Sequence, residues 1–206
     1  MARNSASDPT LSTMSDDATY LHGYDSDEQS RLIAQAAYWR DRLILPDLPF
    51  APGERLLDIG CGVGAVLRVI AEAHPDLRLL GIDAEPRQVE AARRHLRGVG
   101  RGEPDLRVGD AAALPWPDAS IDHVYMMWFI EHLPETIARR VLQEARRVLR
   151  PGGTITINET DYTTFKVWPP SPDWDALEQA QHDHFARVGN PIAGRRLSGL
   201  LAEAGF

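Results

Sequence analysis

The stretch RLLDIGCGVG, residues 55–64, joins a short apolar run to three closely spaced glycines. The apolar run predicts a buried strand, and the apolar spacing of residues 63–71 predicts a helix directly after it. Glycines at such a junction allow a sharp turn and let a ligand approach the main chain without a Cβ in the way. The segment GCGVGA also satisfies the G-x-G-x-x-G/A fingerprint of dinucleotide-binding folds, so the glycines alone leave the ligand open.

The same alternation of strand and helix continues along the chain. A second helical spacing covers residues 137–148. Further short apolar runs that predict strands lie at residues 77–83, 106–110, 121–128 and 154–159. Strands that alternate with helices form parallel sheets covered on both faces. We therefore expect an α/β fold, a doubly wound Rossmann-like parallel sheet with helices on both faces.

The N-terminal part of the chain divides into two segments. Residues 1–17 are rich in Ser, Asp and Thr and are expected to form a disordered arm. Residues 27–45 have the spacing of an amphipathic helix, which Pro46 and Pro49 end. We assign residues 18–50 to an N-terminal helical cap and residues 51–206 to the α/β domain.

The C-terminal part is expected to be helical. Helical stretches are predicted near residues 174–187 and 193–204, after the last predicted strand. The chain then stops at AEAGF, where a glycine is followed by an apolar residue that usually opens the next element. From the sequence we expect the last strands of the sheet to be missing, so that the α/β domain is truncated at its C-terminus.

Composition excludes several classes of protein. The 206 residues carry 22 Lys and Arg against 30 Asp and Glu, a net charge of −8, and one cysteine. An acidic chain is a poor partner for nucleic acid, and one cysteine excludes a disulfide framework or a thiolate zinc cluster. No apolar run approaches the ~20 residues that span a bilayer, and the N-terminus is polar. We expect a cytoplasmic, soluble protein without a membrane partner.

Three groups of residues are expected to be structural. Cys61 is a small packing residue rather than a nucleophile, because no histidine lies near it in sequence. His182 and His184 are two residues apart on a predicted helix and point in different directions, so no metal site is expected. The arginines of the helix at 137–148 are expected on its solvated face: Arg139, Arg140, Arg146 and Arg147.

Polar residues follow the other predicted strands. Asp83 closes the strand at 77–83, where a carboxylate can accept hydrogen bonds from both hydroxyls of an adenosine ribose. Asp58 precedes the glycines, where its charge opposes a pyrophosphate but suits a cationic or amine-bearing ligand. Asp110 and Ala111 follow the third strand, where an adenine edge can lie. These positions favour an adenosine ligand without a pyrophosphate.

Taken in order, five segments resemble the class I S-adenosylmethionine-dependent methyltransferases, small-molecule branch. They are DIGCGVG (58–64), GID (81–83), GDA (109–111), IDHVYMMWFIEHLPE (121–135) and RVLRPGGTITI (147–157). The resemblance extends over about residues 20–206, and YLHGY at 20–24 looks like the start of the cap that folds over the cofactor in that branch. It implies transfer of a methyl group from S-adenosylmethionine to a small-molecule acceptor by a monomer or homodimer, with S-adenosylhomocysteine as product.

The resemblance also implies which residues form the site. The residues that it places at the cofactor are Tyr20, Arg31, Gly60, Gly62, Asp83, Ala84, Gln88, Asp110, Ala111, Met127 and His132. Those that it and the adjoining loops place at the acceptor are Tyr24, Trp128, Glu159 and Tyr162. His132 is also the candidate catalytic acid or base, with packing and capping as its alternative role.

Two other functions remain as alternatives. Tyr162 and Lys166 have the Tyr-x-x-x-Lys spacing of an NAD-dependent short-chain dehydrogenase, but VWPP follows them and no helix tolerates that sequence. A catalytically silent module that binds an adenosine cofactor is the second alternative. The aromatic residues Phe165, Trp168 and Trp174 are expected either to contact an apolar acceptor or to form the core of a lid.

Overall fold

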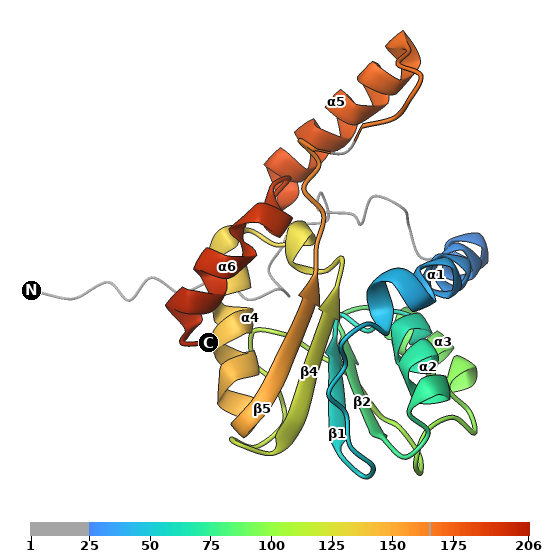
Figure 1. Ribbon diagram of the computed structural model, residues 1–206, viewed down its shortest axis with the longest axis vertical. Helices are drawn as coiled ribbons and strands as arrows, with labels where there is room; N and C mark the ends of the chain where they lie inside the picture. Colours follow the sequence, from blue (N-terminus) through green and yellow to red (C-terminus); the bar gives the residue numbers. More distant parts are fainter. Residues whose placement is uncertain (1–24, 165) are drawn as a thin grey trace, which may run out of the picture.

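A computed structural model describes residues 25–164 and 166–206 and has a five-stranded sheet at its centre (Figure 1). All strand pairs are parallel, and the order across the sheet is β3-β2-β1-β4-β5. The strands are β1 (Arg55–Ile59), β2 (Arg78–Asp83), β3 (Asp105–Val108), β4 (Ile121–Met127) and β5 (Leu149–Asn158). The predicted doubly wound α/β fold is confirmed.

Helices cover both faces of the sheet. Leu56 and Leu57 of β1 are buried in different clusters, because neighbouring side chains of a strand point to opposite faces. Figure 1 shows α1, α2 and α3 beside one face, α4 and α6 beside the other, and α5 extending away from the carboxyl ends of the strands. The helices are α1 (Ser26–Trp39), α2 (Ala65–Ala73), α3 (Pro86–His95), α4 (Glu135–Val148), α5 (Pro172–Val188) and α6 (Ala193–Ala204).

The predicted elements are present with small changes at their ends. The helix expected at 27–45 is α1 followed by a π-helical turn, η2 (Arg40–Ile44), that stops before Pro46. Strand β5 begins at Leu149, earlier than the apolar run at 154–159 indicated. Helix α3 was not singled out by its apolar spacing, because nearly all of its surface is polar and only a few residues face the core.

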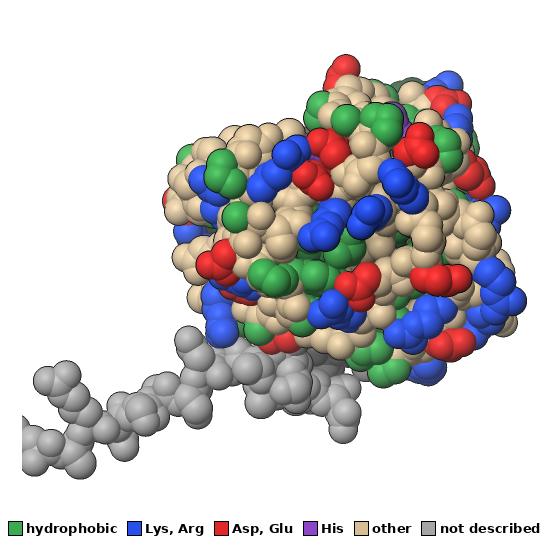
Figure 2. All heavy atoms as spheres, turned by 90° about the horizontal axis from the view of Figure 1, so that it is seen from below, with side chains coloured by type: hydrophobic (Ala, Val, Ile, Leu, Met, Phe, Trp, Pro, Cys, Tyr) green, Lys and Arg blue, Asp and Glu red, His purple; other side chains and the backbone are tan. Residues whose placement is uncertain are grey.

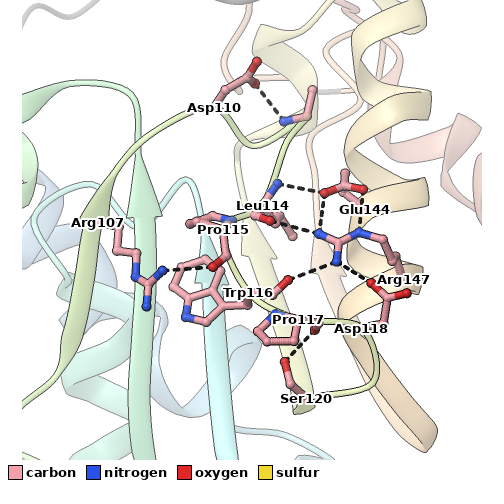
Figure 3. A network of polar contacts seen from close by, with 11 residues as sticks. Arg107, Asp110, Leu114, Pro115, Trp116, Pro117, Asp118, Ser120, Glu144 and Arg147 are labelled. Carbon is pink, nitrogen blue, oxygen red and sulfur yellow. Dashed lines mark hydrogen bonds and ion pairs between the residues drawn. The ribbon is translucent and has the colours of Figure 1, made fainter.

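Arg147 does not lie on a solvated face of α4 as expected. Its guanidinium donates to Glu144, Asp118 and the carbonyl oxygens of Leu114 and Trp116 at 2.7 to 3.0 Å (Figure 3). The planar fork of arginine allows several such bonds at once, which a sequence pattern of charged positions does not reveal. Arg147 therefore fastens the loop that follows β3 to helix α4.

Charges of both signs are mixed on the face at the amino ends of the strands (Figure 2). Arg150, for example, pairs with Glu54 at 2.8 Å and with Asp122 at 2.6 Å. No helix among the described residues is long and apolar enough to cross a membrane. The expected arm at 1–17 and the site residues Tyr20 and Tyr24 lie outside the described residues.

Candidate active site

A cavity of about 310 Å³ opens at the carboxyl ends of β1, β2 and β4. The strand order reverses here, because β1 lies between β2 and β4, and open α/β sheets bind ligands at such a switch point. Helix α1 adds to the wall with Arg31 and Leu32. Most of the predicted site residues line this cavity: Arg31, Gly60, Gly62, Asp83, Ala84, Gln88, Ala111, Met127, Trp128, His132 and Tyr162.

The glycine turn after β1 forms the floor of the cavity. Gly60 has a φ of +76° and Gly62 a φ of +50°, a region that side chains rarely adopt. A Cβ on Gly60 would lie 2.3 Å from a ring carbon of Phe129, whereas a Cβ on Gly62 would meet no atom within 4 Å. Gly60 is therefore required by packing, and Gly62 leaves open space beside the main chain.

Two carboxyl groups stand beside this turn. Asp83 accepts from the backbone N–H of Gly62 at 2.8 Å with one oxygen and from that of Glu85 at 2.9 Å with the other. Burial raises the pKa of Asp83, and burial together with the charge of Asp83 raises the pKa of Asp58 well above its usual range. Burial also raises the pKa of the Cys61 thiol, so that the thiol remains protonated and serves as a packing group.

The segment after β3 contributes its small residues rather than its carboxylate. Gly109 and Ala111 line the cavity. Asp110 does not, because its carboxylate turns back to accept from the backbone N–H of Ala112 at 2.8 Å. Such a local bond is typical of Asp in a turn, so the structure does not bring the predicted Asp110 side chain to the cavity.

Arg31 and Gln88 line the cavity but already have polar partners. Arg31 pairs with the buried Glu28 through two contacts of 2.6 Å and donates to Gln35 at 3.0 Å. Gln88 accepts from the side chain of Gln29 at 3.4 Å. The bonds of Arg31 lie within α1, whereas the bond between Gln29 and Gln88 joins α1 to α3.

Glu131, not Glu159, faces the cavity. Glu159, expected at the acceptor, accepts from the backbone N–H groups of Phe129, Ile130 and Glu131 at 2.6 to 3.2 Å and does not line the cavity. It thereby holds the short 3₁₀ helix η3 (Ile130–His132) against the end of β5. Glu131, which was not predicted as a site residue, lines the cavity with 3% of its surface exposed. Its position next to the predicted His132 is the sequence feature that could have identified it.

Tyr162 and His132 share an aromatic contact that attaches α5 to the site. The ring of Tyr162 stacks on Phe185 with centroids 4.6 Å apart, and the His132 ring lies 5.2 Å from the same residue. The Tyr162 hydroxyl donates to Glu131 at 3.1 Å. Phe185 is 1% exposed, so its burial fixes the position of both cavity residues.

The remaining candidates lie away from the cavity. Lys166 pairs with Glu178 of α5, and residues 162–164 form a turn, so the Tyr-x-x-x-Lys arrangement of a dehydrogenase is not built. Trp168 is 87% exposed and Trp174 42% exposed, and neither lines the cavity or is buried in a lid core. Phe165 lies outside the described residues, and the described residues contain no cluster of three metal-ligating side chains.

The backbone of Trp128 is strained where β4 ends. Its φ is +51°, a conformation that is rare for a bulky residue and marks functional sites more often than other positions. The backbone N–H of Trp128 donates to the carbonyl of Asn158 at 2.9 Å, which holds the residue in place beside β5. This geometry presents Trp128 to the cavity instead of continuing the strand.

Comparisons with known proteins identify the family of the chain. A family model described as a methyltransferase domain matches residues 57–157. The chain is 38% identical over 142 residues to the 27-O-demethylrifamycin SV methyltransferase of Amycolatopsis mediterranei, a match that covers 67% of this chain and 50% of that protein. It is 31% identical over 203 residues to an O-methyltransferase of Aspergillus nomiae, covering 90% and 88% of the two chains.

A solved structure shows the same fold. The S-adenosylmethionine-dependent methyltransferase of Thermotoga maritima, a possible histamine N-methyltransferase, matches with a TM-score of 0.64 at 23% identity, over 87% of this chain and 76% of that one. The chain spans about half the length of the first curated relatives that it matches. With these similarities and this sheet order, the chain belongs to the family of class I S-adenosylmethionine-dependent methyltransferases.

Proposed function

We propose that this cavity binds S-adenosylmethionine and that the chain transfers its methyl group to a small molecule. The observation that carries the proposal is the cavity itself, which joins the glycine turn and Asp83 to a wall formed by Trp128, His132 and Tyr162. The residues fit the cofactor, because the main chain at Gly62 faces open space and Asp83 supplies a carboxylate beside it.

The proposed roles follow the walls of the cavity. Asp83 accepts hydrogen bonds from the ribose, with Ala84 and Gln88 beside it, and the backbone of Ala111 meets the adenine. Gly60 and Gly62 leave room for the methionine part, whose methyl end lies toward Met127 and His132. All of these residues line the same cavity.

We also propose that the acceptor is an apolar small molecule with a hydroxyl group. The names of the two curated relatives described above support an oxygen acceptor. Trp128, Leu133 and Tyr162 give the cavity large apolar surfaces, on which such a molecule packs while water is excluded.

The chain's part in the reaction is then mainly positioning. When bound, the cofactor supplies an activated methyl group on a sulfonium sulfur. The cavity walls would hold the acceptor oxygen beside that methyl group and exclude water from it. A base is needed only to remove the hydroxyl proton; His132, whose ring is fixed by Phe185, is one candidate for that base.

Calorimetric titration of the purified chain tests the cofactor assignment. We expect micromolar binding of S-adenosylmethionine and of S-adenosylhomocysteine, and no binding of NAD⁺ or NADH. Binding of NAD alone would contradict the proposal. Binding of both S-adenosyl ligands without methyl transfer to any apolar hydroxyl compound screened by mass spectrometry would favour the catalytically silent alternative.

The two glycines of the turn provide a matched test of the floor of the cavity. Gly62→Ala is expected to fold with a loss of about 1 to 2 kcal/mol for its positive φ and to bind S-adenosylhomocysteine at least ~10-fold more weakly. Gly60→Ala adds the clash with Phe129 and is expected to lose about 3 kcal/mol or more. Urea unfolding and calorimetry separate the two effects; equal stability of the two variants contradicts this account.

A further inference from the structure

Two glutamates from different strand ends meet beside the cavity. Glu131 lines the cavity and accepts from the backbone N–H of Thr160 and from the hydroxyl of Tyr162, both at 3.1 Å. Glu159 lies behind it, and one of its oxygens accepts from the backbone N–H of Glu131 itself at 3.2 Å. We call these two residues the Glu131–Glu159 pair.

Burial favours the protonated form of the Glu131–Glu159 pair. Burial raises the pKa of Glu131, while burial and the neighbouring Glu131 charge raise the pKa of Glu159 to about 8. Among the described residues, no lysine or arginine forms an ion pair with either carboxyl. Two carboxyls at one buried place cannot both ionise without cost, so the proton belongs to the pair rather than to one member.

The other ionisable groups near the pair are few. The Tyr162 hydroxyl, which donates to Glu131 at 3.1 Å, is the closest, and Nε2 of His132 lies 3.8 Å from the same oxygen. Helix α5 presents the uncharged ring of Phe185 here. Around the rest of the cavity stand Arg31, Asp58 and Asp83. On the wall that Trp128, His132 and Tyr162 form, the carboxyl is that of Glu131, with Glu159 behind it.

We propose, on the basis of the proposed function, that Glu131 takes up the proton that the acceptor loses. We also propose that the positive charge of the bound cofactor determines when this uptake occurs. The carbon–oxygen bond to the acceptor forms as the carbon–sulfur bond breaks, the electron pair stays on sulfur, and the hydroxyl proton passes to the Glu131 carboxylate. Glu131 is thus a catalytic residue, and Glu159 and Tyr162 position it.

The charge dependence follows from electrostatics. A cation within about 6 Å of a carboxyl lowers its pKa by about 1 to 3, so a sulfonium in the cavity favours the ionised form of the Glu131–Glu159 pair. That charge disappears when the methyl group is transferred. The pair then regains its affinity for a proton at the moment when the acceptor must release one.

Proton release on ligand binding tests the proposal without any acceptor. Calorimetric titrations at pH 6.5, in buffers of different ionisation enthalpy, give the number of protons released per ligand. At this pH an ordinary α-amino group, with a pKa of about 7.7 to 8.0, stays protonated. We expect S-adenosylmethionine to release up to about one proton more than S-adenosylhomocysteine. Equal release overturns the proposal, whereas failure of both ligands to bind overturns the proposed function itself.

Two variants test whether the released proton comes from the Glu131–Glu159 pair. Glu131→Gln is expected to abolish the difference between the two ligands, because it removes the carboxyl of the pair that lines the cavity. Glu159 lies outside the cavity, and the change also removes the Glu131 charge that raises its pKa. Glu90→Gln, an exposed glutamate on α3, is the matched control and is expected to keep the wild-type difference. A full difference in Glu131→Gln overturns the assignment.

Tyr162→Phe keeps the test decisive if Glu131→Gln does not fold. This change removes only the hydroxyl that donates to Glu131, and loss of a donor to the charged form raises the pKa of a carboxyl. In Tyr162→Phe, the pH at which the difference in proton release between the two ligands is half-maximal is expected to be higher than in the wild type. An unchanged midpoint overturns the proposal.

Discussion

Asp83→Ala is expected to lower the affinity for S-adenosylmethionine by about 100-fold or more. A hydrogen bond to a charged group contributes about 1.5 to 3 kcal/mol, and a carboxylate at the end of β2 can accept from both ribose hydroxyls. The substitution also removes the acceptor of the Gly62 N–H, which holds the glycine turn in the shape that leaves the cavity open. Both effects act against binding, and 100-fold corresponds to about 2.7 kcal/mol.

Calorimetry of Asp83→Ala with S-adenosylhomocysteine, beside the wild type, measures this loss. The matched control is Glu85→Gln, a neighbouring acid that caps α3, pairs with Arg87 and lies outside the cavity. It is expected to retain wild-type affinity. Asp83→Asn keeps the shape of the side chain and one acceptor oxygen, and its affinity is expected to lie between those of Asp83→Ala and Glu85→Gln. Wild-type affinity in Asp83→Ala would remove Asp83 from the cofactor site.

The proposed cofactor end of the cavity was predictable because its parts are local. Gly60 and Gly62 follow the apolar run of β1 directly, and Asp83 ends the next strand. Neighbouring parallel strands bring their carboxyl ends to one edge of the sheet. The pairing of Ile59 with Ile82 then places the glycine turn beside Asp83, so strand ends alone were enough to find this part.

The proposed acceptor end was less predictable because its geometry depends on contacts distant in sequence. Glu131 lines the cavity in place of the expected Glu159, because the η3 turn directs its N–H groups at Glu159. The positive φ of Trp128 sets the direction of that turn. The spacing of apolar residues in a sequence does not indicate a positive φ at a single residue.

Hydrogen bonds in the folded chain also set the direction of single side chains in ways that the sequence pattern did not predict. Asp110 has the expected position in sequence, but a turn captures its carboxylate. Arg147 follows the exposed Arg146 on α4, yet its guanidinium meets the loop after β3. A charged residue on a helix face is exposed only when no loop passes over that face.

Arg147→Met is expected to lower the free energy of unfolding by about 2 to 3 kcal/mol. The Arg147 side chain is 31% exposed, so its ion pairs with Glu144 and Asp118 stabilise the fold less than buried ion pairs would. The larger part of the loss comes from the carbonyl oxygens of Leu114 and Trp116, which lose their donors. For a chain of this size the loss corresponds to a decrease in Tm of about 4 to 12 °C.

The matched control for this loss is one residue away on the same helix. Arg146→Met removes an exposed arginine whose bond to the Gly205 carbonyl is long, at 3.3 Å, and is expected to change the free energy of unfolding by no more than about 0.5 kcal/mol. Arg147→Lys, which keeps the charge without the planar fork, is expected to recover less than half of the loss. Urea unfolding of the three variants distinguishes geometry from charge: full recovery by lysine would mean that charge alone holds the loop, and equal losses in the two methionine variants would mean that the contacts of Arg147 contribute nothing special to stability.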